Sequence, residues 1–243
     1  MASSNSVRTK LLRAETVADG TMAFHLSKPP DFEFRPGQSV DLTLLDPPET
    51  DTEGNIRTFS LANAPFQKEL MVATRIRDTA FKRVLSKAAP GLEMSIDGPS
   101  GSFVLHRKVE KPAVLLAGGI GITPFLSMIQ DATHDRTEHQ IWLFYSNRRP
   151  EDAPFLDRLT EAAKQNPRFH LIPTMTEMSK SKREWRGETG LIDKDLLLKH
   201  LESLQGPIYY LAGPPAMVAA MRRMLVEGKV DEDDIRTEEF SGY

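Results

Sequence analysis

The chain has 243 residues, a formal net charge of −3 and no cysteine. This length favours two domains of about 100–130 residues each over one small domain. The lack of cysteine excludes disulfides, thiolate catalysis and a cysteine-ligated iron–sulfur cluster within the chain, and the balanced charge argues against a nucleic-acid-binding protein.

The sequence also argues against a metal site and a membrane span. The six histidines include no pair at the spacing of metal ligands on a helix. No stretch approaches the roughly 20 apolar residues that cross a bilayer, and residues 1–10 lack the apolar run of a signal peptide. We therefore expect a cytoplasmic protein.

Residues 7–105 contain short segments in which apolar and polar residues alternate, and this period of two predicts strands. A single helix interrupts them: it begins after Thr79, a candidate N-cap, buries Phe81 and ends near residues 90–91. The close spacing predicts a small antiparallel Greek-key β-barrel. The predicted strands are residues 7–17, 21–27, 40–44, 57–63, 70–76, 92–96 and 101–105.

From residue 111 onward, short continuous apolar runs alternate with longer helical segments, a pattern typical of buried parallel strands. It predicts a doubly wound α/β parallel sheet. We therefore expect a first domain over residues 1–108 and a second over residues 109–243. The predicted strands are residues 113–117, 141–145, 169–174, 208–212 and about 235–240, and the predicted helices are residues 123–133, 152–165, 193–202 and 215–226.

A glycine-rich turn joins the first of these apolar runs to a helix that opens with Pro124. Gly119 and Gly121 let the backbone approach a phosphate, and the helix N-terminus offers unpaired N–H groups to an anion. Thr123 is a candidate cap and phosphate ligand, and Pro124 suits the first helical turn. The third glycine of the dinucleotide fingerprint is absent, so the turn by itself leaves open a purely structural β-α connection.

Four motifs follow one another along the chain: RTFS at 57–60, GGIGITP at 118–124, AGPPAM at 212–217 and EFSGY at 239–243. In this order they resemble the ferredoxin–NADP reductase family, in the form without an iron–sulfur domain. The resemblance extends from about residue 7 to the end of the chain. It implies an enzyme that takes hydride from NAD(P)H onto bound FAD and passes electrons to a separate carrier such as a ferredoxin or flavodoxin.

On the flavin side, the resemblance assigns Arg57 to the FAD pyrophosphate, Phe59 to the flavin ring or ribityl chain and Ser60 to a catalytic position near flavin N5. Phe59 stands where the family usually has tyrosine. The start of the barrel-domain helix is the second phosphate contact that the resemblance implies. The implied flavin-binding residues are Arg57, Thr58, Phe59, Ser60, Arg75, Ile76, Thr79, Ala80 and Phe81.

On the coenzyme side, the resemblance implies a backbone platform for the nicotinamide at 213–217, with Ala212 where the family usually has cysteine. Arg148 and Arg149 follow the strand at 141–145, where they would accept a 2′-phosphate, so we expect a slight preference for NADPH over NADH. The implied coenzyme-binding residues are Gly119, Gly121, Thr123, Pro124, Ser146, Arg148, Arg149, Gly213, Pro214 and Met217.

The last residue, Tyr243, resembles the final tyrosine that lies over the flavin in related reductases, and Phe240 is the alternative aromatic. A ring on that face must leave before the nicotinamide stacks on the flavin, which makes Tyr243 a candidate gate and a second catalytic residue. Two other functions stay open: a free flavin or ferric reductase, and an electron-transfer subunit of a larger complex.

Overall fold

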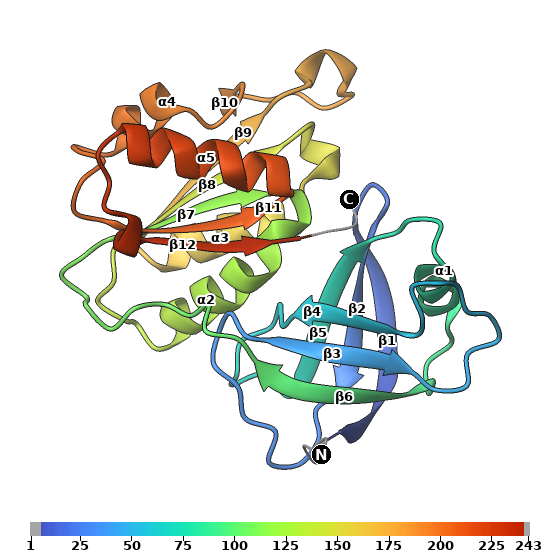
Figure 1. Ribbon diagram of the computed structural model, residues 1–243. Helices are drawn as coiled ribbons and strands as arrows, with labels where there is room; N and C mark the ends of the chain where they lie inside the picture. Colours follow the sequence, from blue (N-terminus) through green and yellow to red (C-terminus); the bar gives the residue numbers. More distant parts are fainter. Residues whose placement is uncertain (1–5, 241–243) are drawn as a thin grey trace.

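The computed structural model describes residues 6–240, which form two six-stranded sheets in succession (Figure 1). The first is antiparallel, with strand order β4-β3-β6-β1-β2-β5. Just beyond its edge strands, the Ala62 N–H donates to the Met71 carbonyl at 2.8 Å and closes the sheet into a barrel. Its strands are β1 (Val7–Ala18), β2 (Thr21–Ser27), β3 (Ser39–Leu44), β4 (Ile56–Ser60), β5 (Glu69–Arg75) and β6 (Glu93–Ser100).

Helix α1 (Ala80–Lys87) interrupts the barrel strands between β5 and β6, as the sequence predicts. Thr79 caps it with extended backbone angles, and its hydroxyl accepts a hydrogen bond from the Lys82 N–H at 3.4 Å. The helix buries Phe81 and Leu85 in the apolar core of the barrel. This packing fixes the N-terminus of α1 beside strand β4.

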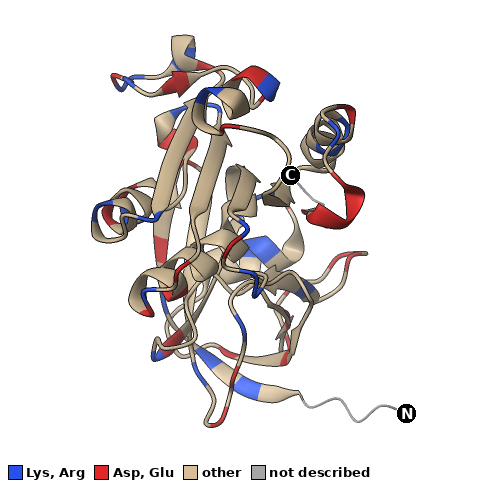
Figure 2. Ribbon diagram, turned by 90° about the vertical axis from the view of Figure 1, so that its left-hand side faces the viewer, with Lys and Arg blue, Asp and Glu red and all other residues tan. Residues whose placement is uncertain are grey.

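The second sheet is parallel, with strand order β10-β9-β8-β7-β11-β12 and helices on both faces. Leu115 of β7 packs toward α2 and α3, whereas its neighbour Leu116 packs toward α4 and α5, so both faces are covered and central strands such as β7 are apolar. Figure 2 shows these strands largely free of charged residues, which gather on helices and loops. The elements are β7 (Ala113–Gly118), α2 (Ile122–His134), β8 (Ile141–Asn147), α3 (Leu156–Gln165), β9 (Phe169–Met175), β10 (Glu188–Thr189), α4 (Lys194–His200), β11 (Ile208–Gly213), α5 (Pro215–Glu227) and β12 (Ile235–Glu239).

These two sheets confirm the predicted fold class, but the predictions for residues 101–105 and for Thr123 are wrong. Residues 101–105 form no strand, because Phe103 leaves the barrel and packs against Phe125 and Tyr210, with ring centroids 5.7 and 5.6 Å away. Thr123 does not cap α2. The chain enters the helix through a 3-10 turn whose last residue, Gly121, is the cap, and the Thr123 hydroxyl donates to the Ile120 carbonyl at 3.1 Å.

Four further features bear on the organisation of the chain. The short strand β10 was missed by the sequence analysis, and α3 begins at Leu156 rather than at residue 152. Residues 101–112 connect the two sheets without a helix or strand, and the predicted domain boundary after residue 108 falls inside this connection. Within residues 6–240, no helix has the length and apolar character needed to cross a bilayer.

Candidate functional site

Strand β4 forms one wall of a cavity of about 470 Å³ between the barrel and the second sheet. Ser60 lines it; its side chain is buried, and no other described residue forms a hydrogen bond with its hydroxyl. This hydroxyl is therefore free to bond a ligand. The lining residues are Glu53, Arg57, Thr58, Phe59, Ser60, Ala73, Thr74, Arg75, Arg77, Thr79, Lys82, Ile120, Thr123 and Phe240.

Arg57 reaches this cavity from a tightly held position. Its guanidinium donates to a Glu53 carboxylate oxygen at 2.7 Å and to the Glu53 backbone carbonyl at 2.9 Å. It also lies over the ring of Phe81, 5.3 Å from the centroid. Its side chain is only 18% exposed. A guanidinium held in this way is oriented to bind a paired anionic group.

The N-terminus of α1 borders the same cavity through Thr79. The Ala80 N–H donates to the Asp51 carboxylate at 2.7 Å, so the helix start already binds an anionic oxygen. This hydrogen bond lowers the pKa of Asp51. Three predicted flavin ligands lie behind the cavity wall: Ala80 is fully buried, and Phe81 and Ile76 pack on the barrel core.

A second cavity, of about 910 Å³, lies at the carboxyl edge of the parallel sheet. Strands β7 and β11 are neighbours in this sheet, which places the glycine turn beside Gly213 and Pro214. A side chain at Gly121 would lie 2.4 Å from the Ala212 carbonyl oxygen, so only glycine fits there. The lining includes Gly118, Gly119, Ser146, Asn147, Arg148, Asp152, Asp193, Lys194, Pro214, Met217, Met221 and Met224.

The two cavities are contiguous, because Arg75, Arg77 and Ile120 line both of them. One ligand on β4 and a second ligand on the glycine turn would therefore meet at the boundary between the sheets. The carboxyl edge of a parallel sheet is the usual place for a dinucleotide. The arrangement fits two bound cofactors whose reactive rings are in contact.

Comparisons with known proteins agree with this geometry. Residues 115–223 match the family model described as the oxidoreductase NAD-binding domain. The chain is 29% identical to the anthranilate 1,2-dioxygenase electron transfer component of Acinetobacter baylyi, covering 96% of this chain and 67% of that protein. It is 30% identical to the ferredoxin–NAD(P)(+) reductase component of the naphthalene 1,2-dioxygenase system of Pseudomonas putida, covering 81% of this chain and 56% of that protein.

The solved structure of a ferredoxin NADP+ reductase from Neisseria gonorrhoeae, with FAD and NADP bound, superposes with a TM-score of 0.79. It is 21% identical, and the match covers 96% of this chain and 98% of that one. The chain is similar to ferredoxin reductases in sequence and in fold. It is a flavin-dependent NAD(P)H oxidoreductase of that type, with FAD and NAD(P) as its cofactors. The curated relatives extend beyond the part that aligns with this chain.

The residues present fit these cofactors. Arg57 and the N-terminus of α1 border the first cavity, where they would hold the anionic part of a flavin nucleotide. Ser60 and Phe59 line the same cavity, where they would contact its ring. The backbone of Gly118 and Gly119 lines the second cavity, where it would accept the coenzyme diphosphate.

The two arginines after β8 differ in position. Arg148 lines the coenzyme cavity and donates to Asp152 at 3.1 Å. Arg149 does not belong to the lining: it binds Asp152 at 2.7 Å and Asp19 of the β1–β2 turn at 3.3 Å. Both arginines lower the pKa of the buried Asp152 carboxyl. Only Arg148 is therefore placed to meet a 2′-phosphate.

The C-terminal aromatics were predicted to cover the flavin. Phe240 lines the flavin cavity, and its N–H donates to the Gly213 carbonyl at 3.0 Å. Tyr243 lies outside the described residues, so its role as a gate stays a prediction. The described end of the chain thus places an aromatic ring in the wall of the flavin cavity.

Glu238 is a residue that the sequence analysis missed. It pairs with Ala212 across β12 and β11, one residue before the Gly213-Pro214 turn. Its Oε2 atom is buried and has no hydrogen-bond partner among residues 6–240. Burial raises the pKa of Glu238 to about 7, so it changes charge near neutrality. Two acids occur side by side in this strand, so the sequence alone gives no signal that singles out Glu238.

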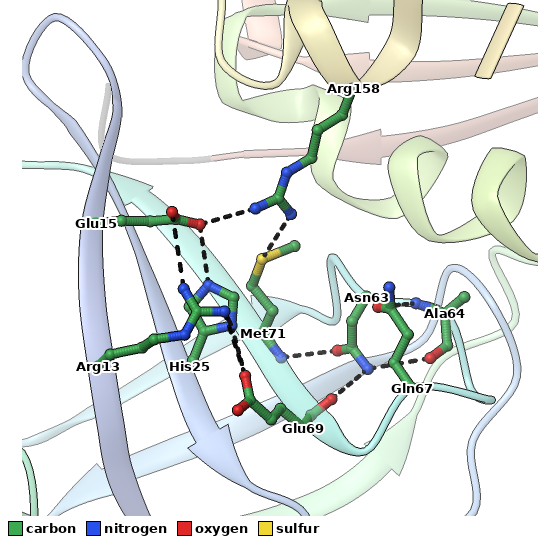
Figure 3. Close-up of polar contacts among 9 residues, drawn as sticks. All are labelled: Arg13, Glu15, His25, Asn63, Ala64, Gln67, Glu69, Met71 and Arg158. Carbon is green, nitrogen blue, oxygen red and sulfur yellow. Dashed lines mark hydrogen bonds and ion pairs between the residues drawn. The ribbon is translucent and has the colours of Figure 1, made fainter. Parts of the chain in front are cut away.

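A cluster of polar contacts joins the barrel to α3 (Figure 3). Arg158 of α3 donates to Glu15 of β1 at 2.8 Å and contacts the Met71 sulfur at 3.5 Å. His25, which is buried, lies between Glu15 and Glu69, with its ring nitrogens 3.0 and 3.1 Å from their carboxylates. These contacts lie away from the residues of both cavities, so we interpret them as structural.

Proposed function

We propose that the protein takes hydride from NAD(P)H onto bound FAD and passes the electrons to a separate carrier of the ferredoxin or flavodoxin type. The observation that carries this proposal is the pair of contiguous cavities, one on the barrel and one on the glycine turn. Hydride transfer needs donor and acceptor atoms about 3–3.5 Å apart, which contiguous sites allow. FAD, when bound, supplies a ring that accepts a hydride and can release electrons one at a time.

The roles of the protein's own residues follow from their positions. Ser60 offers its free hydroxyl to the flavin ring, and Arg57 binds the diphosphate in place of Glu53. Phe240 packs at the junction and excludes water from it. On the coenzyme side, Met217 and the glycine turn hold the nicotinamide end, while Arg148 selects a 2′-phosphate and so favours NADPH.

The named relatives support a protein carrier or oxygenase as the acceptor, because both belong to dioxygenase systems. Two alternatives remain in competition: a free flavin or ferric reductase that binds flavin as a substrate, and an electron-transfer subunit of a larger complex. Arg57 and the N-terminus of α1 would both bind the flavin diphosphate, which favours a flavin that stays bound over one that is released as a product. We also propose a cytoplasmic location, where NADH and NADPH are made and consumed. The boundary between the two domains is proposed to follow residue 108.

Steady-state reduction of an artificial electron acceptor, with NADH and NADPH compared side by side, tests the enzyme class and the coenzyme together. We expect activity with both coenzymes and a lower KM for NADPH. Gel filtration should leave FAD on the protein, whereas complete loss of flavin would favour the free flavin reductase. No reduction of the acceptor by either coenzyme would refute the proposal.

A further inference from the structure

The flavin cavity carries an excess of positive charge. Among the described residues that line it, Arg57, Arg75, Arg77 and Lys82 are cationic and only Glu53 is acidic. Arg57 is paired with Glu53 at 2.7 Å. The side chains of the other three cations form no hydrogen bond or ion pair with any described residue. Unpaired cations gathered around one cavity fit a ligand with more than one negative charge.

Lys82 is the least favourably placed of these cations. It lies in the first turn of α1, where the helix dipole repels a positive charge. Burial lowers the pKa of its ammonium group, and the charges of Arg77 and Arg57 lower it further. The helix dipole, burial and the neighbouring arginines all disfavour the charged form of this side chain. A residue that breaks local rules in this way commonly serves a ligand.

Carboxylates bind part of this anion site in the structure. Asp51 accepts from the Ala80 N–H at 2.7 Å, and Glu53 accepts from Arg57 at 2.7 Å. Both acids come from the same loop between β3 and β4. They satisfy the Ala80 N–H and Arg57, the two groups already assigned to the diphosphate, but neither forms a hydrogen bond or ion pair with Lys82. The charge of Glu53 raises the pKa of Lys82 only enough to offset part of the lowering by burial, Arg77 and Arg57.

We propose that Lys82 binds the diphosphate of the flavin cofactor, together with Arg57 and the N-terminus of α1. The inference rests on the proposed function, because it requires that this cavity holds a flavin nucleotide. The diphosphate replaces the carboxylates of Asp51 and Glu53, and its charge offsets the cost of placing an ammonium group at the helix start. Lys82 is thus a binding residue and takes no part in hydride transfer.

The test compares FAD with riboflavin, which has the same ring and no phosphate. Dissociation constants are measured by flavin fluorescence on flavin-free wild-type protein and on the variants K82Q, K82R and K87Q. Lys87 is an exposed lysine of the same helix and serves as the matched control. We expect K82Q to weaken FAD binding about tenfold or more, as for the loss of a charge-assisted hydrogen bond. Riboflavin binding should stay unchanged, K82R should retain most of the FAD affinity, and K87Q should match the wild type.

The outcomes separate this inference from the proposed function. If K82Q binds FAD as tightly as K87Q does, Lys82 is not a diphosphate ligand. An equal loss of FAD and riboflavin affinity in K82Q would show a structural role and also overturn the inference. If K82Q does not fold, K82M, which also removes the charge, takes its place: loss of FAD affinity with riboflavin binding preserved supports the inference, and FAD affinity equal to that of K87Q contradicts it. Wild-type protein that binds no FAD would instead refute the proposed function.

Discussion

Replacing Glu238 by glutamine should stabilise the protein at alkaline pH and much less at acid pH. Burial raises the pKa of Glu238 to about 7 from an ordinary value of 4.5. The fold therefore favours the protonated carboxyl. This contribution to stability is complete below about pH 4.5 and is lost as the pH rises to about 7, because the unfolded chain ionises first. Glutamine stays neutral and avoids the cost of burying a carboxylate.

The difference between the two pKa values corresponds to about 3 kcal/mol, of which roughly 2–3 kcal/mol should develop between about pH 5 and pH 8. Urea unfolding of flavin-free wild type and E238Q at these two pH values measures this pH-dependent difference in stability. The free energy of unfolding of E238Q should exceed that of the wild type by this additional amount at the higher pH. Exposed Glu239, the next residue in the same strand, gives the control variant E239Q. A stability difference that is the same at both pH values would show that the Glu238 carboxyl titrates normally, and the reasoning from burial would fail.

Three further predictions concern the cofactors. Arg57→Ala should weaken FAD binding by about 1.5–3 kcal/mol, measured by flavin titration; unchanged affinity would count against its assignment to the diphosphate. Arg148→Ala should raise the KM for NADPH and leave that for NADH nearly unchanged, whereas Arg149→Ala should spare both, and equal effects of the two variants would refute the selectivity argument. Deletion of Tyr243 should strengthen the binding of oxidised coenzyme by about 1–3 kcal/mol, which lowers its Kd, because the tyrosine ring no longer competes with the nicotinamide for the flavin. Turnover should slow, because the product leaves more slowly. If both stay at wild-type values, the gate is not Tyr243, and Phe240→Ala becomes the decisive variant.

The sequence predicts the parts of this fold that depend on local pattern. Alternation places Val40, Leu42 and Leu44 on the inner face of β3, and they are buried. The continuous apolar run at 113–117 becomes the central strand β7, and Thr79 caps α1. Each of these depends on residues close together in the chain, where period and capping preference are informative.

The failures depend on contacts between distant residues. Phe103 abandons a strand because Phe125 and Tyr210 offer it a buried site, and neither lies near it in the sequence. Arg149 turns from the coenzyme cavity because Asp19, 130 residues away, binds it. No local pattern could reveal either partner. Whether the Ser60 hydroxyl has a hydrogen-bond partner likewise depends on residues that surround it in space and are distant in the sequence.

Arg149 links the coenzyme cavity to the barrel through two ion pairs. The buried Asp152 carboxylate binds both Arg148, in the coenzyme cavity, and Arg149, which reaches Asp19 of the barrel. Beside it, the Asp19 N–H donates to the Glu151 carbonyl at 2.9 Å. A phosphate that draws Arg148 away from Asp152 leaves the carboxylate to Arg149 alone. We expect coenzyme binding at Arg148 to act in this way on a contact between the barrel and the second sheet, and hydride transfer is sensitive to displacements of about 1 Å.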